Sequence, residues 1–379
     1  FQTSHTLWKI DNRRVCSSMA GRVMNYFAGG NTSQGFYNLF DSNLANLERL
    51  FILKGGPGTG KSYLIKKIGK VWLRRGYSLE YMNCSSNKDS VEGIITRELN
   101  VGIVDETNPH ALEPKYPGVI DDYVNMSEAC QRERLLESKN EIISLTNQVR
   151  IAFQSAYDAF HEAQTFHNKQ RQRTAEMRSD ERLQQWTEKL VTTLFQNKPK
   201  RATSTVKHRF HGANTPTGPY SFLNELVAPL EKRYVLNGRV GTGTSIILKR
   251  LLLEAEIRGL DLEVYHCGFE PEQIDLLIIR ELGVAIVVNK KPYELRDIRQ
   301  TDEVLNVEEL VFDTVQYEED RVLKQAYEEK MSEGLSSLAK AKALRDQLEH
   351  HYQRALDFSK TTSIRQRIMR EIEAIASGQ

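Results

Sequence analysis

The sequence of 379 residues predicts an α/β fold of two tandem units, each a parallel sheet in a three-layer αβα arrangement with a long helical arm. Three observations support this prediction. A glycine-rich loop occurs twice, apolar runs of strand length alternate with helical segments around each loop, and a long polar stretch follows each unit. Strands that alternate with helices at this spacing are typical of a parallel sheet covered by helices.

The two glycine-rich loops are residues 55–62 (GGPGTGKS) and residues 238–245 (GRVGTGTS). The first satisfies the phosphate-binding pattern G-x-x-x-x-G-K-[ST], whereas the second has Thr244 in place of the lysine. A shift of 183 residues aligns 26–110 with 209–293 without a gap and gives 29 identities over 85 positions. An ungapped match of this length indicates an internal duplication with two units of unequal chemistry.

Composition favours a globular cytoplasmic protein. Charged residues make up 27% and apolar residues 40% of the chain, and a net charge of +2 gives no general attraction to nucleic acid or membrane. No segment approaches the roughly 18 apolar residues of a membrane span, and the first 18 residues lack the apolar centre of a signal peptide. The four cysteines form no C-x-x-C pair, and Cys84 and Cys267, at equivalent repeat positions, are predicted to be buried thiols at strand ends.

The same series of elements is expected in each unit. In the first, they are a strand at 50–53 leading into the loop, a helix from Lys61 to about Arg75 that ends at Gly76, a strand at 78–84, a short helix ending near Leu99 and a strand at 101–104. The second has matching strands at 234–236 and 261–267. Three strands are too few for such a sheet, so 23–27 and 206–210 are candidates for others. Residues 206–210 could complete either sheet.

The arms follow the sheets. Apolar residues recur at helical spacing in both, at Val149, Phe153, Ala156, Phe160 and Ala163 and at Leu338, Ala341, Leu348, Tyr352 and Ala355, where Arg345 interrupts the pattern. This spacing predicts amphipathic, coiled-coil helices that pack on a partner helix. The arms could pack together, fold back as hairpins, or bind a protein partner or a second copy. The predicted divisions are an extension (1–18), core 1 (19–127), arm 1 (128–198), core 2 (199–306) and arm 2 (307–379), with a basic linker around 197–211.

The first loop predicts a nucleotide site that uses ATP and Mg²⁺. Its glycines let successive backbone N–H groups face one anion, and the following helix adds its positive end. Lys61 is expected to reach the β- and γ-phosphates, and Ser62 to bind Mg²⁺. The predicted nucleotide-binding residues are Gly55, Gly56, Pro57, Gly58, Thr59, Gly60, Lys61, Ser62 and Tyr63.

Acidic residues at the end of the third strand complete the predicted site. Asp105 follows the apolar run 101–104 and is expected to hold the metal, and Glu106 to orient the attacking water. Two weaker candidates are His110, which could approach the γ-phosphate or lie on the surface, and Asp89. For Asp89, the alternatives are activation of an acceptor or a helix N-cap, which Ser90 could also provide.

The second unit lacks two of these charged groups. Thr244 corresponds to Lys61 and Val288 to Asp105, so hydrolysis at the second loop is not expected. The degenerate loop comprises Gly238, Gly241, Thr242, Gly243, Thr244 and Ser245. Its backbone amides could retain weak nucleotide affinity, or the unit could be a purely structural companion.

With both loops, the Asn-Thr-x-x-Gly segments, Val-Asp-Glu-Thr-Asn-Pro-His and Tyr-His-Cys-Gly-Phe in view, the chain resembles the tandem P-loop ATP-binding proteins of spore-forming Gram-positive bacteria. The resemblance extends from about Met19 over most of the chain. It implies ATP binding in the bacterial cytoplasm but no particular substrate. The family carries a lysine in both loops and an Asp-x-Thr-x-Pro-His element in both halves, from which this chain departs at Thr244, Val288 and Tyr293.

Three functions are compatible with these features. The first is a P-loop NTPase that hydrolyses ATP at the first loop and uses its arms mechanically or for a partner. The second is a kinase that transfers the γ-phosphate to a small molecule or nucleotide. The third is a nucleotide-gated binding protein without turnover. A ring ATPase ranks lower, because no later sensor strand or arginine finger is visible in the sequence.

Overall fold

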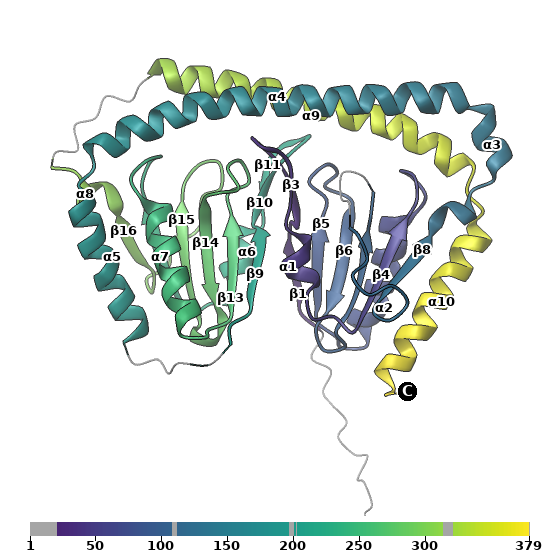
Figure 1. The fold of residues 1–379 in the computed structure, drawn as a ribbon, viewed down its shortest axis with the longest axis horizontal. Coiled ribbons are helices and arrows are strands. Elements are labelled where there is room, and N and C mark those ends of the chain that lie inside the picture. The colour runs from purple at the N-terminus through teal and green to yellow at the C-terminus, as the bar shows by residue number, and fades with distance from the viewer. Residues whose placement is uncertain (1–20, 108–111, 197–200, 202, 314–320, 379) are drawn as a thin grey trace, which may run out of the picture.

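The computed structural model describes residues 21–107, 112–196, 201, 203–313 and 321–378. It contains two six-stranded sheets side by side, with two long helices running along the same side of both (Figure 1). The expected extension at 1–18 and His110 lie outside the described residues.

In the first sheet, the strands lie in the order β1 (Val23–Tyr26), β5 (Leu79–Asn83), β6 (Val91–Thr96), β7 (Val101–Asp105), β4 (Arg49–Lys54) and β8 (Asp121–Asn125).

The second sheet repeats this order. It runs β9 (Val206–Phe210), β13 (Leu262–His266), β14 (Ile274–Ile279), β15 (Val284–Asn289), β12 (Lys232–Asn237) and β16 (Glu303–Asn306). Each unit also has a short hairpin, β2 (Gly29–Thr32) with β3 (Gly35–Asn38), and β10 (Gly212–Thr215) with β11 (Gly218–Ser221). The chain therefore contains two α/β units of the same topology, as the repeat predicts.

The sheets are mixed rather than parallel throughout. β6 pairs antiparallel with both β5 and β7, and β14 does the same in the second sheet, while the other pairings are parallel. The short helix expected to end near Leu99 is therefore wrong, because strand β6 occupies most of that segment. All six residues of β6 and of β14 are buried, so both segments lack the alternation of buried and exposed residues that marks a half-buried strand.

Two edge strands complete each sheet. β1 pairs with β5 in the first sheet, and β9 pairs with β13 in the second. The hypothesis that 206–210 completes the first sheet is thus wrong. β8 and β16, which the sequence did not predict, each add a sixth strand beside the strand that enters the loop.

A helix follows each glycine loop, as predicted. α2 spans Lys61–Arg74 and α7 spans Thr244–Ile257. Both stop before a glycine with positive φ, 90° at Gly76 and 69° at Gly259. Glycine adopts this left-handed conformation without the steric cost that a Cβ imposes, so it ends the helix at little cost.

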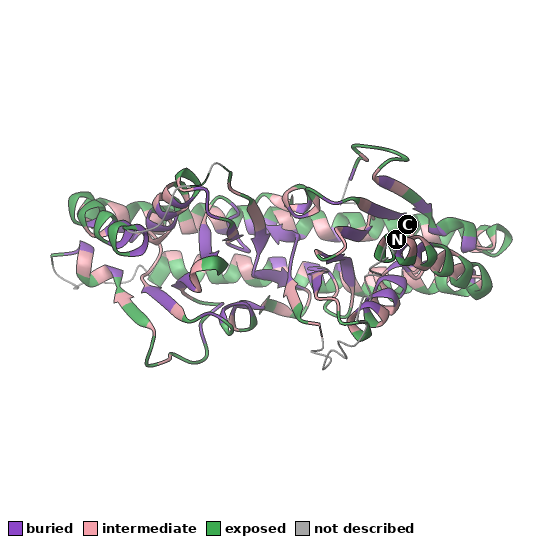
Figure 2. Ribbon diagram, turned by 90° about the horizontal axis from the view of Figure 1, so that it is seen from below, coloured by how far each residue is buried: buried purple, intermediate pink, exposed green. Residues whose placement is uncertain are grey.

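The two faces of each sheet are covered differently. The outer face of the first sheet packs on α2 and on α10 (Phe358–Ala376), and that of the second packs on α7 and α5 (Asp180–Phe195). Among the described residues, α1 (Phe40–Leu44) and α6 (Leu223–Val227) are the helices on the inner faces, which share one apolar cluster. Figure 2 shows the strands largely buried. The expected three-layer arrangement is therefore incomplete, because short helices rather than a full helical layer cover the inner faces.

The arms pack together. α4 (Lys139–Met177) and α9 (Arg321–Arg354) run antiparallel along each other (Figure 1). Phe160 of α4 and Leu338 of α9 belong to one buried cluster, and a Cβ on Gly334 would lie 2.3 Å from the Phe160 ring. Of the predicted alternatives, the structure therefore contains the intramolecular pair. Shorter helices precede the long ones, namely η1 (Met126–Ala129), α3 (Arg132–Glu137), η2 (Arg280–Leu282) and α8 (Val307–Val311).

Each arm ends on the opposite unit. Arm 1 leaves the first sheet, and its α5 packs on α7, where Glu188 pairs with Arg250 at 2.8 Å. Arm 2 leaves the second sheet, and its α10 packs on the first unit, where Glu371 pairs with Arg49 at 2.8 Å. The helical arms therefore tie the two units together from both directions. Among the described helices, none is long and apolar enough to cross a membrane.

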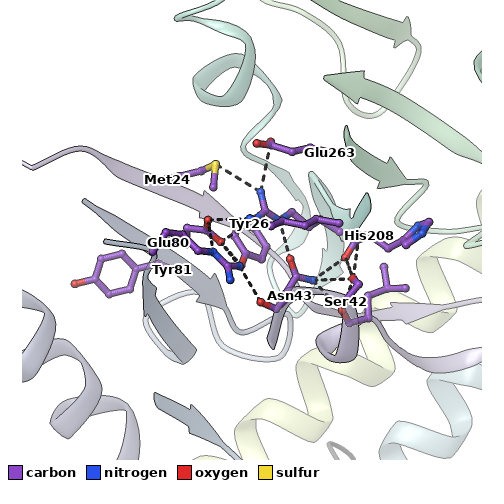
Figure 3. Close-up of polar contacts among 12 residues, drawn as sticks. Met24, Tyr26, Ser42, Asn43, Glu80, Tyr81, His208 and Glu263 are labelled. Atoms are coloured by element: carbon purple, nitrogen blue, oxygen red, sulfur yellow. Dashed lines mark hydrogen bonds and ion pairs between the residues drawn. The ribbon is translucent and has the colours of Figure 1, made fainter. Parts of the chain in front are cut away.

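The units meet at residues that are equivalent in the repeat. Phe27 and Phe210 form an isolated antiparallel bridge with N–O distances of 3.0 and 2.9 Å, which marks an approximate two-fold relation between the units. The neighbouring equivalent pair, Tyr26 and Arg209, breaks that symmetry. The fully buried Arg209 guanidinium lies 4.0 Å from the Tyr26 ring centre and contacts the equivalent glutamates Glu80, at 2.7 Å, and Glu263, at 3.4 Å (Figure 3).

Candidate functional site

The first glycine loop connects the buried strand β4 to α2. Gly58 and Gly60 have φ values of 77° and 85°, which allow the tight curl of the loop. Lys61 is the first residue of α2, and its Nζ donates hydrogen bonds to the carbonyls of Gly55, at 2.8 Å, and Gly56, at 2.7 Å. The structure therefore contains the strand, loop and helix that the motif requires, with the lysine folded over its own loop.

Asp105 lies beside this lysine. It ends β7, the parallel neighbour of β4, and its Oδ1 is 3.8 Å from Lys61 Nζ. Burial lowers the pKa of Lys61, and the positive charge of Arg345 adds to this effect, while Asp105 opposes it. Thr107 donates a hydrogen bond to Asp105. The predicted phosphate-binding cation and metal carboxylate thus come together at the carboxyl ends of two adjacent strands.

Ser62 occupies the next position on α2. Its Oγ accepts a hydrogen bond of 3.0 Å from the backbone N–H of Val91, which starts β6, and Ser245 accepts the same bond from Ile274. This contact anchors the helix to the sheet in both units. It leaves the Ser62 hydroxyl proton and a remaining lone pair for other interactions.

Glu106 faces a different partner from Asp105. Its carboxylate forms an ion pair of 3.1 Å with Lys54, whose ammonium lies 3.9 Å from the Tyr123 ring centre. Lys54 belongs to β4 and Tyr123 to β8. Both strands lie on one side of β7, which Glu106 follows, and β6 lies on the other side. The role of Glu106 in orienting water remains a prediction.

The structure brings two further groups to this edge of the sheet. Glu92 is a buried residue of β6, and the buried Cys84 follows β5. Burial raises the pKa of the Cys84 thiol well above its usual value, and the Glu92 carboxylate adds to the increase. Sequence reasoning missed Glu92, although the repeat contains a signal for it, because an acid stands at the equivalent position of both buried strands, as Glu92 and as Asp275. The buried thiols predicted at Cys84 and Cys267 are confirmed.

Helix α9 lies directly against the first loop. A Cβ on Gly56 would lie 2.5 Å from the Tyr352 ring, and a Cβ on Gly58 would lie 2.5 Å from the Glu349 carbonyl oxygen. α9 belongs to the arm of the second unit. Glycine at these two positions therefore serves close packing against the arm as well as the curl of the loop.

A pocket of about 590 Å³ opens beside the loop. It is lined by Gly58, Gly60 and Tyr63 on one side and by the corner between α9 and α10, including Phe358, on the other. The Tyr63 and Phe358 side chains are 59% and 73% exposed. Two aromatic rings thus border an open space next to the predicted phosphate position.

Asp89 does not belong to this group. It is exposed in the turn between β5 and β6, and its backbone carbonyl accepts a hydrogen bond from Lys66. The helix N-cap predicted for Asp89 or Ser90 is wrong, because a strand rather than a helix follows.

The second loop has the same backbone but different contacts. Gly241 and Gly243 have φ values of 91° and 101°, as in the first loop. The backbone N–H of Arg239 donates a hydrogen bond of 2.9 Å to the Glu308 carboxylate, and Arg178 of arm 1 donates one of 2.7 Å to the Gly241 carbonyl. Side chains and helices of the protein itself therefore contact this loop.

The edge of the second sheet is occupied by ion pairs. Val288, the next-to-last residue of β15, is the equivalent of Asp105 in the first unit. Asp275 pairs with Lys290 at 2.7 Å. Glu270 binds His167 and Arg171 of α4. The charges at this edge are thus neutralised within the protein.

Among the residues described by the structure, no three His, Cys, Asp or Glu side chains gather into a metal-binding cluster. In comparisons with protein-family models, curated proteins and solved structures, the chain matched none of them.

Proposed function

We propose that the chain is a P-loop NTPase that binds ATP with Mg²⁺ at its first loop and hydrolyses it there, and that the second unit is a structural companion. One observation carries the proposal. Lys61, at the start of the helix that leaves a glycine loop, lies 3.8 Å from Asp105 at the end of the adjacent parallel strand. This pairing of a phosphate-binding cation with a metal carboxylate is characteristic of P-loop sites.

The residues present fit a phosphate group and Mg²⁺. The curl at Gly58 and Gly60 and the free N-terminal turn of α2 provide N–H groups for an anion. Mg²⁺ usually binds through one or two protein oxygens together with phosphates and waters, so the absence of a dedicated cluster among the described side chains is compatible with it. Ser62 and Asp105 would hold the ion, which would neutralise charge on the phosphates.

The aromatic pocket fits the rest of the nucleotide. Because it adjoins Gly58 and Gly60, a nucleoside attached to phosphates on the loop can enter it. Tyr63 and Phe358 would provide faces for base stacking, which does not by itself distinguish adenine from guanine. The choice of ATP over GTP rests on the resemblance described above.

Two features support a structural role for the second unit. It lacks both charged groups that handle phosphate and metal, and its loop N–H at Arg239 is already paired with Glu308. A nucleotide there would have to displace that carboxylate without help from a lysine.

The proposal is tested by measuring nucleotide binding and phosphate release. The wild-type chain should bind Mg·ATP, measured by titration calorimetry, and release free phosphate. Lys61→Ala should lose both, whereas Thr244→Ala, the matched change in the second loop, should retain both. Addition of GTP in parallel tests base selection.

Each outcome has a definite reading. Intact ATP binding in Lys61→Ala would contradict the assigned site. Phosphate found on an added acceptor instead of in solution would favour the kinase, and ATP binding without release over hours would favour a nucleotide-gated binding protein. Loss of binding in Thr244→Ala would contradict the structural role of the second unit.

A further inference from the structure

We propose that Arg345 of α9, in the arm of the second unit, binds the γ-phosphate of the nucleotide held by the first loop. The arm would thereby distinguish ATP from ADP. This inference rests on the function proposed above and adds a residue that the glycine-loop motif does not contain.

The position of Arg345 follows from helix geometry. Glu349 and Tyr352, which contact Gly58 and Gly56, lie four and seven residues after Arg345. Residues at this spacing share one face of an α-helix, so Arg345 lies on the loop-facing side, one turn before the contact with Gly58. The apparent interruption in the apolar pattern of α9 is therefore a guanidinium directed toward the first unit.

The groups that act on the charge of Arg345 include residues at the edge of the sheet where the predicted site lies. Burial opposes its charge, but Cys84, Glu349, Asp105 and Glu92 outweigh this effect and raise its pKa. A guanidinium on this side of α9 would give an anion bound at the first loop a second cationic partner beside Lys61.

The contact of α4 with the second loop can be compared with that of α9 with the first loop. Gly241, the equivalent of Gly58, contacts Arg171 of α4, and His167 lies one turn before Arg171, as Arg345 lies one turn before Glu349. There, Glu270 pairs with both His167, at 3.0 Å, and Arg171. The first unit has the neutral Asn87 at the position of Glu270. The unit with the degenerate loop thus supplies the carboxylate of Glu270 as a partner for its arm, whereas the equivalent residue of the first unit, Asn87, carries no charge.

Arg345 has a replaceable partner. Its Nε lies 3.4 Å from the Glu349 carboxylate on the same helix, and their side chains are 21% and 23% exposed. A phosphate oxygen forms a stronger charge-assisted hydrogen bond to a guanidinium than a partly exposed ion pair at this distance provides. Exchange of Glu349 for the γ-phosphate would therefore couple the nucleotide to α9, and through α9 to the second unit.

The test compares ATP with ADP. Arg345→Ala should weaken Mg·ATP binding about ten- to a hundredfold, the worth of one charge-assisted hydrogen bond, while Mg·ADP affinity should change less than about twofold. Lys61→Ala should weaken both nucleotides. Arg354→Ala, an exposed arginine near the end of the same helix, is the matched control and should bind both as the wild type does.

A second variant keeps the inference testable if Arg345→Ala does not fold. Glu349→Gln removes the competing carboxylate and should tighten Mg·ATP binding several-fold without affecting Mg·ADP. Equal effects on ATP and ADP, or no effect of either variant, would overturn the role of Arg345 while wild-type binding still supports the first loop as a nucleotide site. A wild-type chain that binds neither nucleotide would instead overturn the proposed function itself.

Discussion

Asn31 and Asn214, which are equivalent in the repeat, exchange hydrogen bonds across the boundary between the units. The Asn31 amide donates to the Asn214 carbonyl at 3.1 Å, and the Asn214 amide donates to the Asn31 carbonyl at 3.0 Å. Both residues are buried, and the Tyr157 hydroxyl of α4 also donates to the Asn31 side chain at 3.1 Å. A pair of equivalent residues thus joins the two units, and one member also contacts an arm.

Removal of these amides should destabilise the protein unequally. Asn214→Ala removes the side-chain donor to the carbonyls of Asn31 and Gly268, and a buried carbonyl left without its donor costs about 1–3 kcal/mol. Asn31→Ala should cost more, because it also deprives the Tyr157 hydroxyl of its acceptor. Urea unfolding of both variants measures the difference. Equal losses would show that the contact with α4 contributes nothing.

Arg209 should be the most sensitive charged residue between the units. Arg209→Met removes a fully buried cation from Glu80 and Glu263 and should lower the free energy of unfolding by about 3 kcal/mol. The exposed pair Arg201–Glu281, at 2.8 Å, provides the control, and Arg201→Met should cost less than about 1 kcal/mol. Urea denaturation compares the two, and similar losses would contradict a special role for the buried cation.

The contact between the first loop and α9 can be tested with alanine at two glycines of similar conformation. Gly35 has φ of 89° and open space around it, so Gly35→Ala should cost only the left-handed strain of about 1–3 kcal/mol. Gly58→Ala has the same strain and also pushes a Cβ against the Glu349 backbone. Thermal and urea unfolding should therefore show a clearly larger loss for Gly58→Ala. A loss no larger than that of Gly35→Ala would argue against tight packing of the arm on the loop.

The aromatic pocket gives a prediction about binding rather than stability. Phe358→Ala removes a largely exposed ring and should weaken ATP binding by about 1–3 kcal/mol through lost stacking, with little change in melting temperature. Tyr116→Ala, another exposed aromatic residue outside the pocket, should bind ATP normally. Calorimetric titration of both variants decides whether the pocket holds the base.

Stability should fall as the pH drops from 7 toward 5. Burial lowers the pKa of His211 to about 4, with Asp275 opposing and Lys290 adding to the shift. Burial also lowers the pKa of His266 to about 4. Below about pH 6.5 the unfolded chain therefore binds protons that these folded-state histidines do not, so unfolding becomes easier as the pH falls.

This pH dependence is measured by urea unfolding at several pH values. His211→Gln should flatten the profile between pH 7 and 5, and His161→Gln, an exposed residue of α4, should retain the wild-type profile. A profile unchanged by His211→Gln would show that His211 can be protonated in the folded protein.

Much of each unit could be predicted from local pattern. The loop, the helix that ends at Gly76, the third strand and the long arms follow from glycine positions and from apolar residues at regular spacing. The strand β6 was mistaken for a helix because all its residues are buried, so its pattern carries no period. β8 was missed because only two of its five residues are buried and it lies at the sheet edge.

The candidate site also has a part that could be predicted from local pattern and a part that could not. Lys61 and Asp105 were predicted because each belongs to a strand or helix that is recognisable along the chain, and their meeting follows from parallel strand order. Arg345 could not be placed, because its position depends on where α9 crosses the first unit. In the sequence it is only a charge within an apolar stripe.

The sequence by itself determined the duplication, the order of strand, loop and helix at each glycine loop and the loss of Lys61 and Asp105 equivalents in the second unit, because these are properties of short segments and of their spacing. The tertiary structure alone decided that each arm ends on the opposite unit and contacts that unit's loop. Amphipathic helices specify an apolar face but not the surface that covers it. Here, the absence of side chains at Gly56 and Gly58 lets α9 approach the first loop closely.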